Sequence, residues 1–333
     1  MIVERTCVAP HEIEGAQVSI GAMVSAFSSK VVGQAALRET LLVGILAGGH
    51  VLLESVPGLA KTTAARVIAE SIEGRFARIQ CTPDLLPSDI IGTQIYDSAT
   101  NSFATQLGPV HANIVLLDEI NRSSAKTQSA MLEAMEERQT TIAGTVYPIP
   151  DPFLVIATQN PVDQEGTYPL SEAQTDRFML KDVLRYPTVA EEVDVMMRRD
   201  NGVYDKDRPA TAVIGLDVVR RLQMITRGIH LDPALMSYAS QLVAVTRSPA
   251  QFLPPQLARV VEYGASPRAT LALCQSARAL ALLSGRNHVR PEDVQKLAHR
   301  VLAHRLVLGF EAASAHITAY QIVDAVLAAV RVP

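Results

Sequence analysis

His50-Val-Leu-Leu-Glu-Ser-Val-Pro-Gly-Leu-Ala-Lys-Thr62 joins an apolar run, a turn that contains glycine, and the start of a helical pattern. The apolar residues within 50–54 predict a buried strand. After the turn, Ala64, Val67 and further apolar residues recur at helical spacing, and Gly74 is expected to cap the helix. The stretch therefore predicts a strand, a turn and a helix in direct succession, as α/β domains contain.

The turn offers the groups that bind a nucleoside triphosphate. Backbone N–H groups at a helix amino terminus attract phosphate oxygens, a lysine ammonium reaches the β- and γ-phosphates, and a hydroxyl binds Mg²⁺. Gly58, Lys61 and Thr62 supply these groups. The common pattern has glycine where this chain has Ser55 and Ala60, so an ordinary strand-to-helix turn with a solvated lysine is the alternative.

Strand and helix patterns continue to about residue 185. Short runs, several of them rich in Val and Ile, predict strands at 76–80, 113–117, 153–158 and 178–184. Residues 124–136 predict an amphipathic helix, and hairpins are expected at 91–106 and 139–149. The predicted fold class is α/β, with a parallel sheet flanked by helices and interrupted by two hairpin inserts.

After residue 187 the pattern changes to helices alone. Helical segments are expected at 188–200, 216–227, 232–247, 268–284, 291–304 and 317–330. A length of 333 residues suits two domains. We predict a helical extension over 1–30, a nucleotide-binding core over 31–187 and a smaller all-helical lid domain over 188–333.

Two carboxylates follow the apolar run Ile-Val-Leu-Leu at 114–117. Asp118 can hold hydrated Mg²⁺, and Glu119 can polarise a water for attack on the γ-phosphate. Alone, solvated acids at a strand end explain the pattern better, but a phosphate loop upstream favours the chemical interpretation because hydrolysis needs both parts. Asn160 follows the strand predicted at 153–158 and can orient the attacking water, although asparagine is also common in a turn before proline.

Two arginines stand at the boundaries of predicted elements. Arg177 lies between a short helical segment and the last strand, where a guanidinium can reach the γ-phosphate of a neighbouring subunit. Arg268 begins a helix of the second domain, from which it could reach the nucleotide. The alternatives are a surface pair of Arg177 with Asp176 or Glu172 and a solvated arginine at a helix start.

Composition argues against several classes of protein. With 48% hydrophobic residues, 19% charged residues and a net charge of -4, the chain is expected to be soluble and globular and not a dedicated nucleic-acid binder. The apolar stretch 41–53 is too short and too interrupted for a membrane span, and the amino terminus does not resemble a secretory signal, so a cytoplasmic location is expected. The 3 cysteines lack CxxC spacing, and neither HExxH nor GxSxG occurs.

Taken in order, these segments resemble the AAA+ ATPases and, among them, the MoxR family. The resemblance extends from about residue 31 to residue 304. Its motifs are Pro-Gly-Leu-Ala-Lys-Thr (57–62), Thr-Pro-Asp-Leu-Leu-Pro-Ser-Asp-Ile-Ile-Gly-Thr (82–93), Leu-Asp-Glu-Ile-Asn-Arg (117–122), Ala-Met-Glu-Glu-Arg-Gln (134–139), Ala-Thr-Gln-Asn-Pro (157–161) and Glu-Ala-Gln-Thr-Asp-Arg-Phe (172–178).

The resemblance implies a role for each motif. Catalytic roles fall to the Walker B acid Glu119, to Asn160 as sensor 1, to Arg177 as the finger offered in trans, and to Arg268 as sensor 2. Thr62 and Asp118 would hold Mg²⁺. The residues implied to bind ATP are Val32 and Gly33 on the adenine side and Ser55, Pro57, Gly58, Leu59, Ala60, Lys61, Thr62, Thr63 and Asp118 around the phosphates.

The resemblance also implies what the protein does. Its relatives form rings, typically hexamers, and use Mg·ATP as chaperone-like ATPases that remodel or mature client complexes, in some cases by inserting a metal or another cofactor. A partner with a von Willebrand A domain is commonly involved. In this view Ser55 departs from the usual glycine, whereas Ala60 is familiar in the family.

Two other functions stay open from the sequence. A nucleotide-sensing scaffold would bind ATP and assemble with little turnover, and Ser55 motivates it. A DNA-dependent motor is disfavoured because the first predicted hairpin has little positive charge and 139–149 contains no Lys or Arg, so no nucleic-acid partner is expected.

Overall fold

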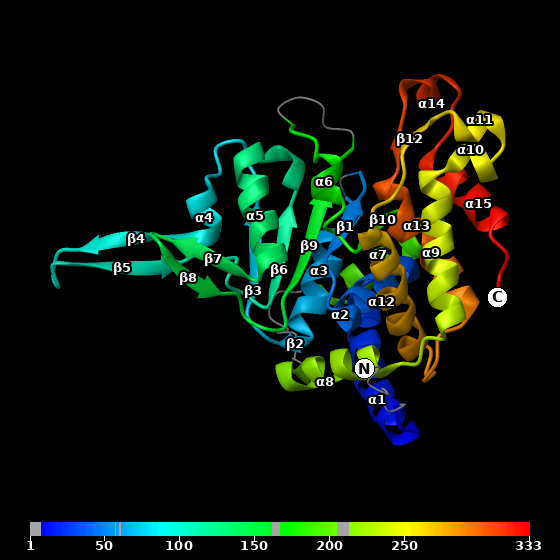
Figure 1. Ribbon diagram of the computed structural model, residues 1–333. Coiled ribbons are helices and arrows are strands. Elements are labelled where there is room, and N and C mark those ends of the chain that lie inside the picture. Colours follow the sequence, from blue (N-terminus) through cyan, green and yellow to red (C-terminus); the bar gives the residue numbers. More distant parts are fainter. Residues whose placement is uncertain (1–7, 57, 60, 162–166, 205–212) are drawn as a thin grey trace, which may run out of the picture.

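The computed structural model describes residues 8–56, 58–59, 61–161, 167–204 and 213–333. A five-stranded sheet, all of whose pairs are parallel, organises the first half of the chain (Figure 1). In spatial order its strands are β10 (Leu180–Val183), β1 (Val51–Glu54), β9 (Leu154–Gln159), β6 (Ile114–Asp118) and β3 (Phe76–Gln80). All five strands expected from the sequence are confirmed, and they form one sheet.

The sheet is buried on both faces because its central strands are almost wholly apolar. Val51 pairs with both Ile156 and Leu180, which brings β1 between β9 and β10. Successive side chains of a strand point to opposite faces, so Leu53 enters one core cluster and Leu52 the other. This double burial fixes the register of the strands, and thereby the positions of the polar residues at their ends.

Helices cover the two faces of the sheet (Figure 1). The cluster on one face contains residues of α1 (Pro10–Lys30), α2 (Ala35–Ala47) and α3 (Lys61–Glu70). The other cluster contains Met131, Leu132 and Met135 of α5 (Ala125–Glu137) and Ile90 of the short α4 (Pro87–Ile91). Ser124 caps α5 by accepting from the Thr127 N–H.

Both predicted hairpins are present and project from one side of the core (Figure 1). The first pairs β4 (Gly92–Asp97) with β5 (Ser102–Leu107), and the second pairs β7 (Gln139–Ile142) with β8 (Thr145–Pro148). Tyr147 Oη donates to Thr105 Oγ1 at 2.9 Å, which joins one hairpin to the other. A short 3-10 helix, η1 (Ile120–Arg122), follows β6.

The carboxyl-terminal part is the predicted helical lid. Its main helices pack together in the larger core cluster. They are α9 (Pro233–Arg247), α12 (Pro267–Leu283), α13 (Pro291–Leu302) and α15 (Ala319–Ala329). Shorter elements are α10 (Pro249–Phe252), α11 (Pro255–Ala258), η2 (Ala303–Arg305), α14 (Phe310–Ser314) and the antiparallel pair β12 (Val261–Tyr263) and β13 (Val307–Leu308), two strands that the sequence did not predict.

Two elements link this part to the core. Strand β11 (Ile214–Gly215) pairs with β2 (Ile72–Glu73), and α8 (Leu216–Gly228) lies against α2. The helix α7 (Val189–Asp200) is held to the end of α1 by Arg198, which donates to the Ser28 carbonyl at 2.7 Å. The expectation that Gly74 caps α3 is wrong, because α3 ends at Glu70 and β2 intervenes. Among the described residues, no helix is long and apolar enough to cross a membrane.

Candidate nucleotide-binding site

The phosphate loop lies between the end of β1 and the first residue of α3. Gly58 has a φ of +87°, a left-handed conformation that glycine adopts without strain. Lys61 is buried, and its Nζ donates to the Ser55 carbonyl at 2.8 Å. Leu59 is buried and Thr63 exposed on the two sides of Lys61, whereas the predicted contacts Pro57 and Ala60 lie outside the described residues. The lysine is thus held at the loop that the sequence predicted.

Ser55 fits the position where the common pattern has glycine. Its φ is not positive, so the backbone conformation does not require glycine there. The side chain is buried, and its hydroxyl donates to the Val56 carbonyl at 2.9 Å. The Ser55 N–H donates to the Gln159 carbonyl at 3.3 Å, which anchors the loop to the neighbouring strand. Ser55 therefore closes the turn without an unsatisfied polar group.

Thr62 and Asp118 meet at the carboxyl ends of the strands, which we call the carboxyl edge. The Thr62 hydroxyl donates to Asp118 Oδ2 at 3.2 Å, although the two residues are 56 positions apart in the sequence. A hydroxyl beside a carboxylate is an oxygen pair of the kind that Mg²⁺ accepts, with water and phosphate oxygens completing its shell. The residues present therefore fit a magnesium ion bound together with a nucleotide.

Two residues that the sequence analysis missed hold Asp118 in place. Thr158 of β9 donates to Asp118 Oδ1 at 2.8 Å, and Arg78 of β3 donates to Oδ2 at 2.6 Å. Burial opposes ionisation of Asp118, but the hydrogen bonds from Arg78, Thr158 and Thr62 outweigh it, so the pKa of this carboxyl lies below its usual value. The only sequence signal for Arg78 was a charged residue inside a predicted strand.

Glu119 stands in a strained backbone conformation beside Asp118. Its φ is +59°, which is uncommon for a residue other than glycine and recurs at functional sites. Its N–H donates to Thr158 Oγ1 at 2.9 Å, and its carboxylate pairs with Arg122 at 3.2 Å. Gln80 Nε2 donates to the same carboxylate at 3.4 Å. The strain and these contacts fix Glu119 at the carboxyl edge.

Asn160 lies at the same edge, directly after β9, and is buried. Asn121 donates to the Asn160 carbonyl at 3.2 Å and accepts from the Asn160 N–H at 3.4 Å. This reciprocal pair ties the end of β9 to the segment after β6. The structure therefore brings Lys61, Thr62 and the two acids together with Asn160 at one edge of the sheet.

Val32 and Gly33 lie in the connection between α1 and α2. Gly33 has a φ of +63°, and a Cβ there would clash with the side chain of Glu191 in α7. Within the described residues, no hydrogen bond joins this connection to the phosphate loop. Its assignment to the adenine side therefore rests on the resemblance.

Arg177 and Arg268 lie at the opposite edge of the sheet. Arg177 precedes β10, and the N–H of the nearby Met179 donates to the carbonyl of His50, just before β1. Because the strands are parallel, this is the edge of their amino-terminal ends, the amino edge. Arg177 and Arg268 both bind Glu136, and among the described residues neither forms an ion pair or hydrogen bond with Lys61, Thr62 or Asp118.

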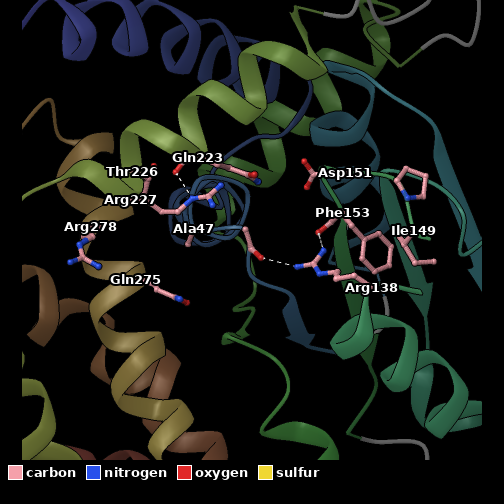
Figure 2. A pocket seen from close by; sticks show the side chains of 12 residues that line it. Ala47, Arg138, Ile149, Asp151, Phe153, Gln223, Thr226, Arg227, Gln275 and Arg278 are labelled. Carbon is pink, nitrogen blue, oxygen red and sulfur yellow. Dashed lines mark hydrogen bonds between the residues drawn. The ribbon is translucent and has the colours of Figure 1, made fainter. Parts of the chain in front are cut away.

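A cavity of about 330 Å³ also lies near the amino edge (Figure 2). Arg227 and Arg278 line one side of it, and Arg138 and Asp151 line the other. Arg138 donates to the carbonyls of Phe153 and Gly48, at 2.7 and 3.2 Å, so it fastens α5 to the start of β9. None of the phosphate-loop or carboxyl-edge residues lines this cavity, so it is separate from the candidate nucleotide site.

A lysine loop at a helix start, a hydroxyl and a carboxylate of the kind that fits Mg²⁺, and a helical lid are the features of a P-loop ATPase of the AAA class. Comparison with known proteins agrees. Residues 50–180 match the family described as "ATPase family associated with various cellular activities (AAA)", and residues 257–326 match the AAA lid domain. The chain belongs to the MoxR family of AAA ATPases, and it is an enzyme that hydrolyses ATP.

Three similar proteins illustrate the relationship. The chain is 46% identical to chaperone MoxR1 of Mycobacterium tuberculosis over 91% of this chain and 79% of that one. It is 31% identical to protein MoxR of Paracoccus denitrificans over 85% of this chain and 87% of the relative. The crystal structure of a candidate ATPase from Cytophaga hutchinsonii is 41% identical, covers 97% of both chains and superposes with a TM-score of 0.89.

Proposed function

We propose that this protein is a Mg·ATP-dependent, chaperone-like ATPase that works as a ring to remodel or mature partner protein complexes. One observation carries the proposal: the Thr62 hydroxyl and the Asp118 carboxylate lie 3.2 Å apart at the edge where the Lys61 loop opens. This contact supports their assignment as Walker A and Walker B residues, which hydrolysis requires close together. When bound, Mg·ATP supplies the γ-phosphoryl group that water attacks.

The residues of the carboxyl edge take distinct roles in this proposal. Lys61 binds the β- and γ-phosphates, and Thr62 and Asp118 hold Mg²⁺. Glu119 accepts a proton from the attacking water, which Asn160 orients. The negative φ and satisfied hydroxyl of Ser55 support turnover over the alternative of a scaffold with little hydrolysis.

Assembly follows from the separation of the two edges. Arg177 lies at the amino edge and binds Glu136, away from the site on its own chain. If Arg177 stabilises charge on a γ-phosphate, that phosphate belongs to a neighbouring copy, whose carboxyl edge faces this amino edge. A closed ring gives every copy such a neighbour, and we propose a hexamer. Arg268, on the lid, takes the role of sensor 2 and responds to the bound nucleotide.

We propose that the client is a protein complex. MoxR1 is named a chaperone, which supports a protein client. We propose a partner with a von Willebrand A domain and an action that includes cofactor or metal insertion. The hairpins 92–107 and 139–148 contain no Lys or Arg, which disfavours nucleic acid as the substrate. We further propose the division into 1–30, 31–187 and 188–333, and a cytoplasmic location.

The decisive experiment measures steady-state ATPase activity against protein concentration with Mg²⁺ for the wild type and Arg177→Ala. Specific activity of the wild type should rise with concentration, and the variant should lose about 1000-fold, as expected for an arginine that acts in trans. Arg331→Ala, which removes an exposed arginine, is the matched control. Activity independent of concentration and unchanged in Arg177→Ala contradicts the ring mechanism.

The same assay separates the alternatives. Wild-type turnover equal to that of Lys61→Ala, with ATP binding confirmed by titration, would instead support the nucleotide-sensing scaffold. ATPase activity stimulated by DNA with a steep dependence on salt would support a DNA-dependent motor.

A further inference from the structure

Glu136, in the last turn of α5, binds two arginines at once. Its Oε2 accepts from Arg177 Nε at 2.8 Å, and its Oε1 accepts from Arg268 Nη2. Arg177 belongs to the core and Arg268 to the first turn of lid helix α12, and the three residues come from separate segments of the chain. One carboxylate therefore joins the two arginines that the motifs single out.

Asp176 and Arg305 complete this group, which we call the arginine cluster: Glu136, Asp176, Arg177, Arg268 and Arg305. Asp176 Oδ1 accepts from Arg305 Nε at 2.8 Å, and Asp176 Oδ2 lies 3.5 Å from Arg268 Nη1. Ser266, the cap of α12, donates to Asp176 at 2.9 Å. Three guanidinium groups face two carboxylates, so the cluster carries one excess positive charge, which suits an anionic ligand.

The contacts of Arg177 fix the direction of its guanidinium group. Nε donates to Glu136, and Nη1 donates to the Ala173 carbonyl at 2.7 Å. Nη2 has no protein acceptor among the described residues. The Arg177 side chain is 29% exposed, so this nitrogen can be offered outward. Two fixed nitrogens and one available donor are what a preorganised phosphate contact needs.

These ion pairs add little to folding stability. The side chains of Glu136 and Arg268 are 37% and 46% exposed, and water screens the attraction within pairs of this kind. A positional effect can be far larger, since a displacement of about 1 Å in a reacting geometry lowers a rate by about 100-fold. Glu136 can therefore matter more for the orientation of Arg177 than for the stability of the fold.

We propose that Glu136 is a positioning residue that orients Arg177 toward the nucleotide of a neighbouring copy and couples it to the lid through Arg268. The inference rests on the proposed trans role of Arg177. Movement of the lid displaces Arg268, which shifts the shared carboxylate and with it the Arg177 guanidinium.

The test is the steady-state ATPase activity of Glu136→Gln at a protein concentration where the wild type is fully assembled. A glutamine keeps the size and one acceptor but loses the charge and the second acceptor. We expect kcat to fall about tenfold with little change in KM for ATP, because the Lys61 site on each chain is untouched. Glu136→Asp should recover part of the loss, and unfolding temperature should stay near that of the wild type.

Glu137→Gln is the matched control, since Glu137 is the adjacent residue of the same helix and is exposed. In a double-mutant cycle, Glu136→Gln should cost nothing further once Arg177 is alanine. Turnover of Glu136→Gln equal to or above that of Glu137→Gln overturns the proposal, as does an equal loss in the Arg177→Ala background. If Arg177→Ala itself leaves turnover unchanged, the failure lies in the proposed trans mechanism.

Discussion

The two edges of the central sheet hold charged side chains in different ways. At the carboxyl edge, Lys61, Asp118 and Asn160 are nearly inaccessible and are fixed by backbone carbonyls and short side-chain contacts. At the amino edge, Arg177 and Arg268 are 29% and 46% exposed and are held by carboxylates. The carboxyl edge is thus preorganised for a ligand bound by the same chain. The arginines of the amino edge stay accessible, as the proposed contact with a neighbouring copy requires.

The largest effect is expected at the carboxyl edge. Glu119→Gln should lower kcat about 1000-fold while ATP still binds, because the amide cannot accept the proton of the attacking water. The measurement combines single-turnover hydrolysis with ATP titration, and Glu137→Gln is the control. Substantial turnover in Glu119→Gln would contradict the assignment of Glu119 as the proton acceptor and of the carboxyl edge as the site of hydrolysis.

Arg305 should dominate stability at the amino edge. Only 2% of its side chain is exposed, and it donates to Asp176 at 2.8 Å and to the Phe178 carbonyl at 2.7 Å. Arg305→Met should lower the free energy of unfolding by about 3 kcal/mol, since it breaks a buried ion pair. Urea unfolding measures the loss. Arg259→Met, which removes an exposed pair with Glu311, should cost less than about 1 kcal/mol.

His50, which lies at the amino edge, should make the free energy of unfolding depend on pH in the acid range. Burial lowers the pKa of His50 from 6.5 to about 3, with Arg138 adding to the effect, and its Nδ1 accepts from the Val155 N–H at 2.9 Å. Between pH 6.5 and 3, His50 is protonated in the unfolded chain and neutral in the folded chain. The contribution of His50 to the free energy of unfolding should therefore fall by about 1.4 kcal/mol per unit as pH drops below 6.5.

Urea unfolding at pH 7.5 and 5.5 tests this contribution. Burial also lowers the pKa values of His304 and His111, which act in the same direction, so the wild type contains all three contributions. His50→Asn should make the pH dependence shallower by the share that His50 contributes, whereas His316→Asn, at an exposed position, should leave it as in the wild type. An unchanged pH dependence in His50→Asn would contradict the assignment.

The smallest effect is expected from Thr158→Val. The hydroxyl of Thr158 donates to Asp118 and accepts from the Glu119 N–H, so its loss loosens both acids without removing either. We expect kcat to fall about fivefold, or about 1 kcal/mol. Thr141→Val, at an exposed position of β7, is the control. A loss as large as that of Glu119→Gln would mean that Thr158 contacts the reacting groups.

The sequence predicts the sheet and the carboxyl edge well because their signals are local. Apolar runs mark β1, β6 and β9, and the polar residues directly after each strand meet once the strands are parallel. The amino edge could not be predicted in this way. Glu136 lies 132 positions from Arg268, and their pairing depends on how the lid packs on the core. The β2–β11 pair was missed because two-residue strands leave no periodic signal.

The hydrogen bond between Tyr147 and Thr105 joins the two hairpins, so that they can move as one unit. Strand β7 begins at Gln139, immediately after Arg138, the carboxyl-terminal cap of α5. The base of the joined hairpins therefore lies beside the last turn of the helix that carries Glu136. Strands of six residues span about 20 Å, and a rotation of about 10° at the root would carry the tip through about 3 Å. Nucleotide-driven shifts too small to disturb the sheet would thus reach the hairpin tips amplified.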